Sequence, residues 1–328
     1  MFQSSFIDHP HFYLLILTLA YVSTYITGRL ISLAIKEINS GSSQLAKCFS
    51  YLTTGFISLV TIIALIYTRG DSVFLLSLII ILFYIFYRKK THKDINSSFS
   101  KKEFWIFILG YIVLISSFTV SYYSFFIRGG GNLFEDFMFY ANISKVLSVS
   151  HIESISLFID KVSPAMYHYG ELWFNAFWAD LFKVNHLHTL ILVTNTYLLT
   201  LIIIGSIALI HHYLGNKSLF ILLLSILFLV FNPLSSFFVS YQLPILTHPK
   251  FFVIAIFVIF AVLRFIQLDK FMSFNILLLL IPFNSLLVSG ILSGLFFFSI
   301  YYHIRKDGYT IKSFFNKYTI STVFILLF

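Results

Sequence analysis

Apolar runs long enough to cross a lipid bilayer recur along almost the whole chain, and they constrain its fold more than any other feature. A spanning helix needs about 20 apolar residues. Runs of this kind cover 11–35, 48–67, 72–87, 104–127, 188–213, 218–238, 250–267, 272–302 and 314–328. Only 11% of the residues are charged, against about 25% in soluble domains. The sequence therefore predicts an all-α polytopic membrane protein of about 8–10 transmembrane helices.

Two features of the C-terminal part bear on the number of spans. The run 272–302 is too long for one helix across a bilayer, and Pro282 near its middle favours a hairpin of two short helices. The last run reaches Phe328 with no polar tail. We expect either that the natural protein continues beyond this residue or that the final helix is terminal. Residues 1–328 are interpreted as a single integral membrane domain.

Basic residues predict which side of the membrane each loop occupies. The loop 88–103 carries six Lys or Arg residues and is expected in the cytoplasm. Three spans then precede it in 1–103, the loop 128–187 lies outside, and further spans occupy 188–328. The formal charge of +9 does not indicate nucleic-acid binding, because the basic residues lie in short loops between apolar runs. We expect a multi-pass protein of a bacterial inner or plasma membrane with its active face extracytoplasmic.

The predicted outer loop 128–187 is the long interruption in this apolar sequence, and it holds six of the thirteen acidic residues. Asn132 and Glu135 have the spacing of a helix capping box, which predicts a helix over about 133–149. A second helix is expected from 171 to 182. Both carry many apolar residues, so we expect them to lie along the membrane interface.

Two adjacent acids begin the first of these helices. Both are candidate catalytic residues, although capping of the helix explains Glu135 better. For Asp136 two interpretations stand side by side. An acid in the first turn can simply complement the helix dipole, or it can act as a general base for a hydroxyl group at the membrane face.

Five further residues, in two groups, are candidates for substrate binding. His168 and Tyr169 lie just before the second loop helix and Glu171 lies in its first turn, where they could hold a sugar or phosphate; an interfacial aromatic belt is the alternative for the tyrosine. In the next outer loop, His248 and Lys250 could hold a phosphate, or the lysine could anchor the following span.

Metal binding has weaker support in the sequence. His186 and His188 flank one leucine just before a predicted span. They have no acid or cysteine at a matching spacing, and we interpret them as interfacial histidines. We therefore assign no metal ligands and no cofactor; a divalent metal is possible, but no ligand set in the sequence supports one.

The loop resembles the first extracytoplasmic loop of the GT-C superfamily of polytopic glycosyltransferases. The similarity rests on the pattern Glu-Asp-x-x-Phe-Tyr-Ala-x-Ile-Ser at 135–144 and on Tyr-His-Tyr-Gly-x-x-Trp at 167–173. It covers about residues 104–260, although three spans precede the loop-bearing one here and many members have a single span before it. The resemblance implies that Asp136 is the catalytic base, that Tyr140 in the first pattern contacts substrate, and that His248 and Lys250 hold the lipid phosphate.

The expected function is transfer of a sugar from a polyprenyl-phosphate donor to a glycan, lipid or protein acceptor at the extracytoplasmic face. The partners would be the lipid-linked sugar, the acceptor and membrane lipid. A transporter or flippase of lipid-linked sugars is an alternative, but no internal repeat and no acid in the middle of a span supports it. A polymerase or ligase of lipid-linked polysaccharide would use the same face. A non-catalytic membrane subunit is a third possibility, and it would leave the outer acids scattered.

Overall fold

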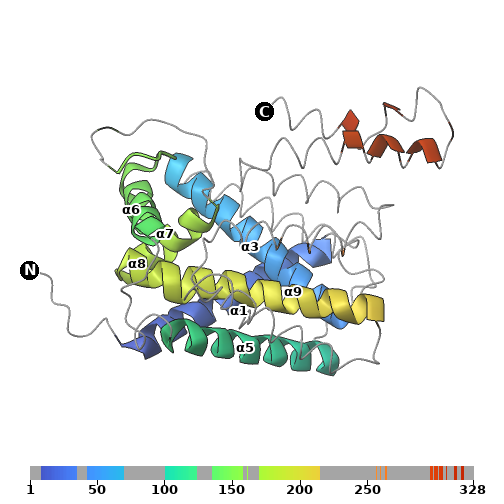
Figure 1. Ribbon diagram of the computed structural model, residues 1–328, viewed down its shortest axis with the longest axis horizontal. Helices are drawn as coiled ribbons and strands as arrows, with labels where there is room; N and C mark the ends of the chain where they lie inside the picture. Colours follow the sequence, from blue (N-terminus) through green and yellow to red (C-terminus); the bar gives the residue numbers. More distant parts are fainter. Residues whose placement is uncertain are drawn as a thin grey trace, which may run out of the picture.

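The computed structural model describes residues 9–34, 43–69, 100–123, 135–157, 161 and 170–214, together with isolated residues between 256 and 320 (Figure 1). Every element formed by these residues is a helix, and no β-strand occurs among them. In chain order the elements are α1 (Pro10–Ala34), α3 (Gln44–Arg69), α5 (Lys101–Tyr122), α6 (Glu135–Ser150), α7 (Gly170–Phe182), α8 (His186–Thr189), the π-helical η4 (Leu190–Asn195) and α9 (Thr196–Leu214). The described part of the chain is therefore all-α, as predicted.

Among the residues that the structure describes, four helical segments are long and apolar enough to cross a membrane, namely Pro10–Ser32, Gln44–Ala64, Lys101–Tyr122 and His186–His211. They confirm helices at four of the predicted runs, with ends that differ by a few residues. The predicted spans 72–87 and 218–238 lie outside the described residues, and those at 250–267, 272–302 and 314–328 lie largely outside them.

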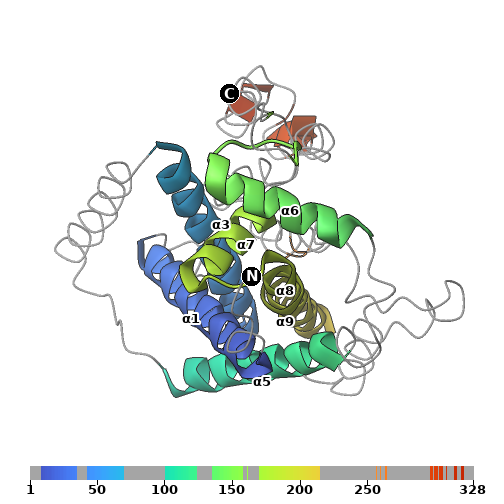
Figure 2. The same cartoon turned by 90° about the vertical axis from the view of Figure 1, so that its left-hand side faces the viewer.

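Within the bundle of these four helices, α1 and the helix that starts at α8 run in one direction, and α3 and α5 run in the other. The start of α1 meets the start of α8, where the Tyr13 hydroxyl lies 3.3 Å from His188 Nδ1. The end of α1 meets the start of α5, where Arg29 Nε lies 2.8 Å from Glu103 Oε1. The loop helices α6 and α7 lie together at one end of this bundle, and α6 lies across it, transverse to α9 (Figures 1 and 2). We call this the loop end.

Large apolar side chains remain exposed along α1 and α5. They recur about every fourth residue, and those on α5 are Phe104, Trp105, Leu109, Ile112 and Ile115. The Trp105 side chain, for example, is 67% exposed. Contiguous apolar surface of this extent is unfavourable in water, whereas lipid is its natural solvent. The exposed stripes therefore agree with an all-α membrane protein.

Two glycines bring α1 and α3 into backbone contact. A Cβ atom added at Gly28 would lie 1.7 Å from the Tyr51 carbonyl oxygen, and one added at Gly55 would lie 1.8 Å from the Thr24 carbonyl oxygen. Each added atom would also lie 2.9 Å from the backbone nitrogen of the other glycine. Small residues allow close helix approach of this kind in membrane proteins. Neither Gly28 nor Gly55 can therefore be replaced by a larger residue unless the two helices move apart.

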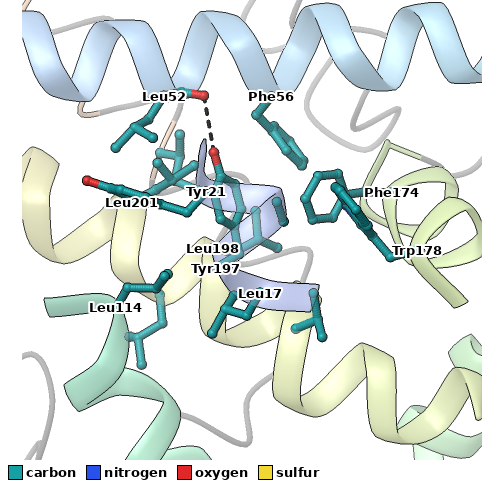
Figure 3. Close-up of a cluster of buried hydrophobic side chains, with 14 of the residues drawn as sticks. Leu17, Tyr21, Leu52, Phe56, Leu114, Phe174, Trp178, Tyr197, Leu198 and Leu201 are labelled. Carbon is teal, nitrogen blue, oxygen red and sulfur yellow. Dashed lines mark hydrogen bonds between the residues drawn. The ribbon is translucent and has the colours of Figure 1, made fainter. Parts of the chain in front are cut away.

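The core of the bundle lies beside this crossing and is closed by Tyr197 of α9 (Figure 3). Its ring centroid lies 5.8 Å from that of Phe56 on α3 and 5.3 Å from that of Phe174 on α7. Its hydroxyl lies 2.9 Å from Thr24 Oγ1 on α1 and 3.3 Å from the Leu52 carbonyl oxygen on α3. One fully buried side chain thus contacts three neighbouring helices, and its polar atom is satisfied.

The helix that carries Tyr197 changes its winding one turn earlier. Residues Leu190–Asn195 form a π-helix between α8 and α9. The Thr196 hydroxyl donates to the Ile191 carbonyl, five residues back, at 3.1 Å, and lies 2.9 Å from Ser121 Oγ on α5. All six π-helical residues are buried. This segment carries the chain from the loop end into the bundle core.

Candidate functional site

The predicted catalytic acids begin the first loop helix. Glu135 is the first residue of α6 and Asp136 the second, close to the helix start predicted at 133. Asn132, the predicted cap, lies outside the described residues. The partial positive charge at a helix N-terminus favours carboxylates in this first turn. The backbone position is thus compatible with both interpretations of Asp136.

Two of the predicted substrate-binding residues are buried. Tyr140 lies on α6 with 2% of its surface exposed, and Glu171 lies in the first turn of α7 with none exposed. Burial of an ionised carboxylate is costly unless protein groups pair with it, and Glu171 does interact with neighbouring groups. A ligand would reach either side chain only after a local rearrangement. His168, Tyr169, His248 and Lys250 lie outside the described residues.

Four polar residues join α6, α7, α8 and η4 beneath the loop end. Ser144 of α6 and Asn175 of α7 are fully buried. The Asn175 amide donates to Ser144 Oγ at 2.9 Å and to the His186 carbonyl oxygen at 3.1 Å, while its own oxygen accepts from the Thr194 hydroxyl at 3.2 Å. His186 Nδ1 lies 3.1 Å from Ser144 Oγ. We call Ser144, Asn175, His186 and Thr194 the junction network.

The other side of the His186 ring faces α7. Its Nε2 lies 3.4 Å from Asp180 Oδ1, and the second oxygen of that carboxylate accepts a hydrogen bond from the Tyr67 hydroxyl on α3 at 3.4 Å. Burial raises the pKa of Tyr67 to about 12, and the nearby Asp180 carboxylate adds to the effect. Tyr67 therefore stays protonated at neutral pH and remains a donor.

Ser144, His186 and Asp180 together have the composition of a hydrolase triad, but not its geometry. A nucleophilic serine must be reachable by substrate and is activated through Nε2 of the histidine. Here Ser144 is fully buried and faces Nδ1. Its oxygen also lies 3.3 Å from the Leu172 carbonyl. The arrangement holds helices together and presents no nucleophile.

The segment that links α6 to α7 is held at its start by aromatic contacts. The Trp173 indole donates to Glu153 Oε1 at 2.9 Å. The Tyr67 ring packs against both Trp173 and His151, with centroid distances of 5.4 and 5.1 Å. His151 has a positive φ of 57°, a conformation that is uncommon without glycine. Trp173 is 1% exposed, so it is a packing residue of the loop and not part of an exposed aromatic belt.

Sequence reasoning did not identify the junction network. Ser144 was part of the resemblance pattern and His186 part of a histidine pair, but neither had a predicted partner. The pair divides in the structure, because His186 faces α6 and α7 whereas His188 faces Tyr13 of α1. The available signal was the presence of Ser144 and Asn175 on the apolar faces of the two predicted loop helices, since buried polar groups need partners.

Within the described ranges, no group of three or more His, Cys, Asp and Glu side chains could hold a metal ion. The junction network supplies a single imidazole and, beyond it, one carboxylate. Comparison with protein-family models, with curated proteins and with solved structures finds no match to this chain. The function therefore has to be inferred from its own residues.

Proposed function

We propose that this protein is a membrane glycosyltransferase that transfers a sugar from a polyprenyl-phosphate donor to a glycan, lipid or protein acceptor. The observation that carries the proposal is the position of α6. This helix lies across the end of a bundle of apolar helices, and its first turn contains Asp136. A lipid-linked donor presents its sugar at the surface of the bilayer, where a helix in this position can meet it.

The distribution of basic residues supports an extracytoplasmic loop end. The stretch 88–103 carries six Lys or Arg residues, and its last two, Lys101 and Lys102, begin α5. The start of α5 pairs with the end of α1, at the end of the bundle away from α6 and α7 (Figure 1). The positive-inside rule assigns that end to the cytoplasm, so the loop helices would face the outside of a bacterial inner or plasma membrane.

In the proposed reaction Asp136 accepts the proton of the acceptor hydroxyl. The hydroxyl oxygen forms a bond to the anomeric carbon of the sugar. The bond between that carbon and the phosphate oxygen breaks, and its electron pair leaves with the polyprenyl phosphate. Lys250 and His248 would stabilise this leaving group. Inversion at the anomeric carbon follows from the family resemblance.

The remaining candidates take different parts in this scheme. His168 and Tyr169 precede α7 directly and would contact the sugar. Tyr140 and Glu171 are buried, so they would support the two loop helices from beneath and would act on the sugar indirectly. No cofactor is required by the scheme.

The test is sugar transfer by purified protein in lipid nanodiscs, with a panel of labelled polyprenyl-phosphate sugars. Asp136→Asn should lower turnover by roughly 10²–10⁴-fold, the usual contribution of a general base, at unchanged protein level. Glu103→Gln, which removes an acid at the other end of the bundle, is the matched control. Near-normal turnover of Asp136→Asn would exclude the assigned role. Movement of the labelled donor across the bilayer without transfer would favour the flippase alternative.

A further inference from the structure

His186 connects both loop helices to the helix that enters the bundle. It is the first residue of α8, and α8, η4 and α9 follow one another without a break. Its ring reaches Ser144 on α6 and Asp180 on α7, and its carbonyl oxygen accepts a hydrogen bond from Asn175 on α7. One residue thus contacts two loop helices at the point where the spanning helix begins.

The contacts around His186 leave little freedom. The Asn175 amide uses both hydrogens and its oxygen, and the side chain is fully buried. Ser144 is also fully buried, and its oxygen faces the Asn175 amide, the His186 ring and the Leu172 carbonyl. Loss of a partner here would leave a buried polar atom unsatisfied, which is unfavourable. The network therefore selects one placement of α6.

The position of Ser144 makes that placement relevant to the first turn of α6. Asp136 precedes Ser144 by eight residues in one continuous helix, which corresponds to about 12 Å along the axis. If α6 pivots at Ser144 by about 5°, a displacement of about 1 Å results at Asp136. A misplacement of about 1 Å in a catalytic group can lower a rate by about 10²-fold.

We propose that His186 is a positioning residue that fixes α6, and with it Asp136, relative to the spanning helix. It acts through Ser144 and does not itself touch substrate, since its two ring nitrogens face Ser144 and Asp180. The placement of α6 follows from the contacts of the network alone. Its effect on turnover rests on the proposed glycosyltransferase function.

The experiment compares three variants of the full chain in nanodiscs. His186→Leu removes both ring nitrogens and keeps the carbonyl that Asn175 contacts. His186→Asn keeps a polar atom at the Nδ1 position, from which it can still reach Ser144. The matched control is His188→Leu, which alters a histidine two residues further along whose ring faces Tyr13 of α1.

The first readout is amide hydrogen exchange of α6 peptides, with α1 peptides as the internal reference. Exchange in α6 should accelerate roughly tenfold in His186→Leu, the effect of losing one buried hydrogen bond. It should stay close to wild type in His186→Asn and in the His188→Leu control. Ser144→Ala should reproduce the acceleration, and it serves as the test if His186→Leu fails to fold.

The second readout is sugar transfer. His186→Leu should lower kcat by about 10- to 100-fold with little change in KM for the donor, and His186→Asn should restore it. Unchanged exchange in α6 for both His186→Leu and Ser144→Ala would overturn the positioning role. A wild-type protein that transfers no sugar from any donor would refute the proposed function, while the exchange data would still decide the positioning role.

Discussion

The contact between Gly28 and Gly55 can be tested by adding a single methyl group. In Gly28→Ala the new Cβ would lie 1.7 Å from the Tyr51 carbonyl oxygen and 2.5 Å from the carbonyl carbon. Ordinary carbon–oxygen contacts are about 3.3–3.6 Å. The two helices would therefore have to separate by about 1.5 Å, because the obstructing atoms belong to the backbone and cannot rotate away.

The cost of this separation follows from what the crossing holds together. Overpacking a core costs about 1–3 kcal/mol when side chains can shift, and a backbone obstruction places this substitution near about 3 kcal/mol. Separation would also move Thr24 away from Leu52. The Tyr197 hydroxyl contacts both residues, so it could no longer keep both contacts. The better helix propensity of alanine offsets about 1 kcal/mol of this cost. We expect Gly28→Ala to lower the free energy of unfolding by about 2 kcal/mol or more.

Unfolding of the protein in bicelles, followed by steric trapping, measures this difference. Gly110→Ala is the matched control, because its Cβ would meet the Tyr21 hydroxyl at 2.3 Å, and a side chain can move where a backbone cannot. The double variant Gly28→Ala/Gly55→Ala should cost less than the sum of its parts, since the first separation makes room for the second. The reasoning is refuted if Gly28→Ala unfolds like wild type or no more easily than Gly110→Ala.

Three further predictions concern the ends of the bundle. Burial, together with Asp180, raises the pKa of Tyr67 to about 12, above the ordinary value near 10. The contribution of the protonated Tyr67 phenol to the free energy of unfolding should thus be complete below about pH 10 and lost as pH rises toward 12. Subtracting the phenolate absorbance of Tyr67→Phe from that of wild type isolates the titration of this residue. A midpoint near pH 10 would contradict the prediction. Glu103→Ala removes the partner that Arg29 Nε contacts at 2.8 Å and should lower the free energy of unfolding by about 1 kcal/mol, less at high salt; an unchanged value in low salt would count against the pair. Trp105 is 67% exposed, and its fluorescence can be followed alone in a variant whose other two tryptophans are replaced by phenylalanine. Brominated lipid should quench this fluorescence more strongly than aqueous iodide does. The reverse order would argue against a lipid-facing α5.

Much of the helical framework was predictable because apolar runs and their interruptions are local signals. The second loop helix was expected over 171–182 and occupies Gly170–Phe182. The first was expected over 133–149 and is described as Glu135–Ser150. In both cases the signals are the polar residues before the helix and the spacing of apolar residues within it. These signals come from neighbouring positions in the sequence, so no knowledge of the tertiary structure was needed.

The contacts that assemble these helices could not be predicted in the same way. Ser144 and His186 are 42 residues apart, and the apolar pattern of α6 says which side is buried but not what covers it. Burial of Tyr140 follows from this docking. The close approach of Gly28 to Gly55 likewise depends on how two helices cross, because an isolated glycine in a run indicates no particular partner.

The π-helix Leu190–Asn195 has a consequence for the phase of the helix that contains it. A wider turn accommodates one residue more than an α-helix would, so the side chains after it are offset by about 100° from their regular α-helical directions. Thr194 can therefore point to the loop helices while Tyr197 points to the α1–α3 crossing. Removal of one residue from this turn would leave the hydropathy of the span nearly unchanged. It would nevertheless rotate the side chains of α9 about the helix axis, so that either the Thr194 contact to the loop helices or the Tyr197 contact to the α1–α3 crossing was lost.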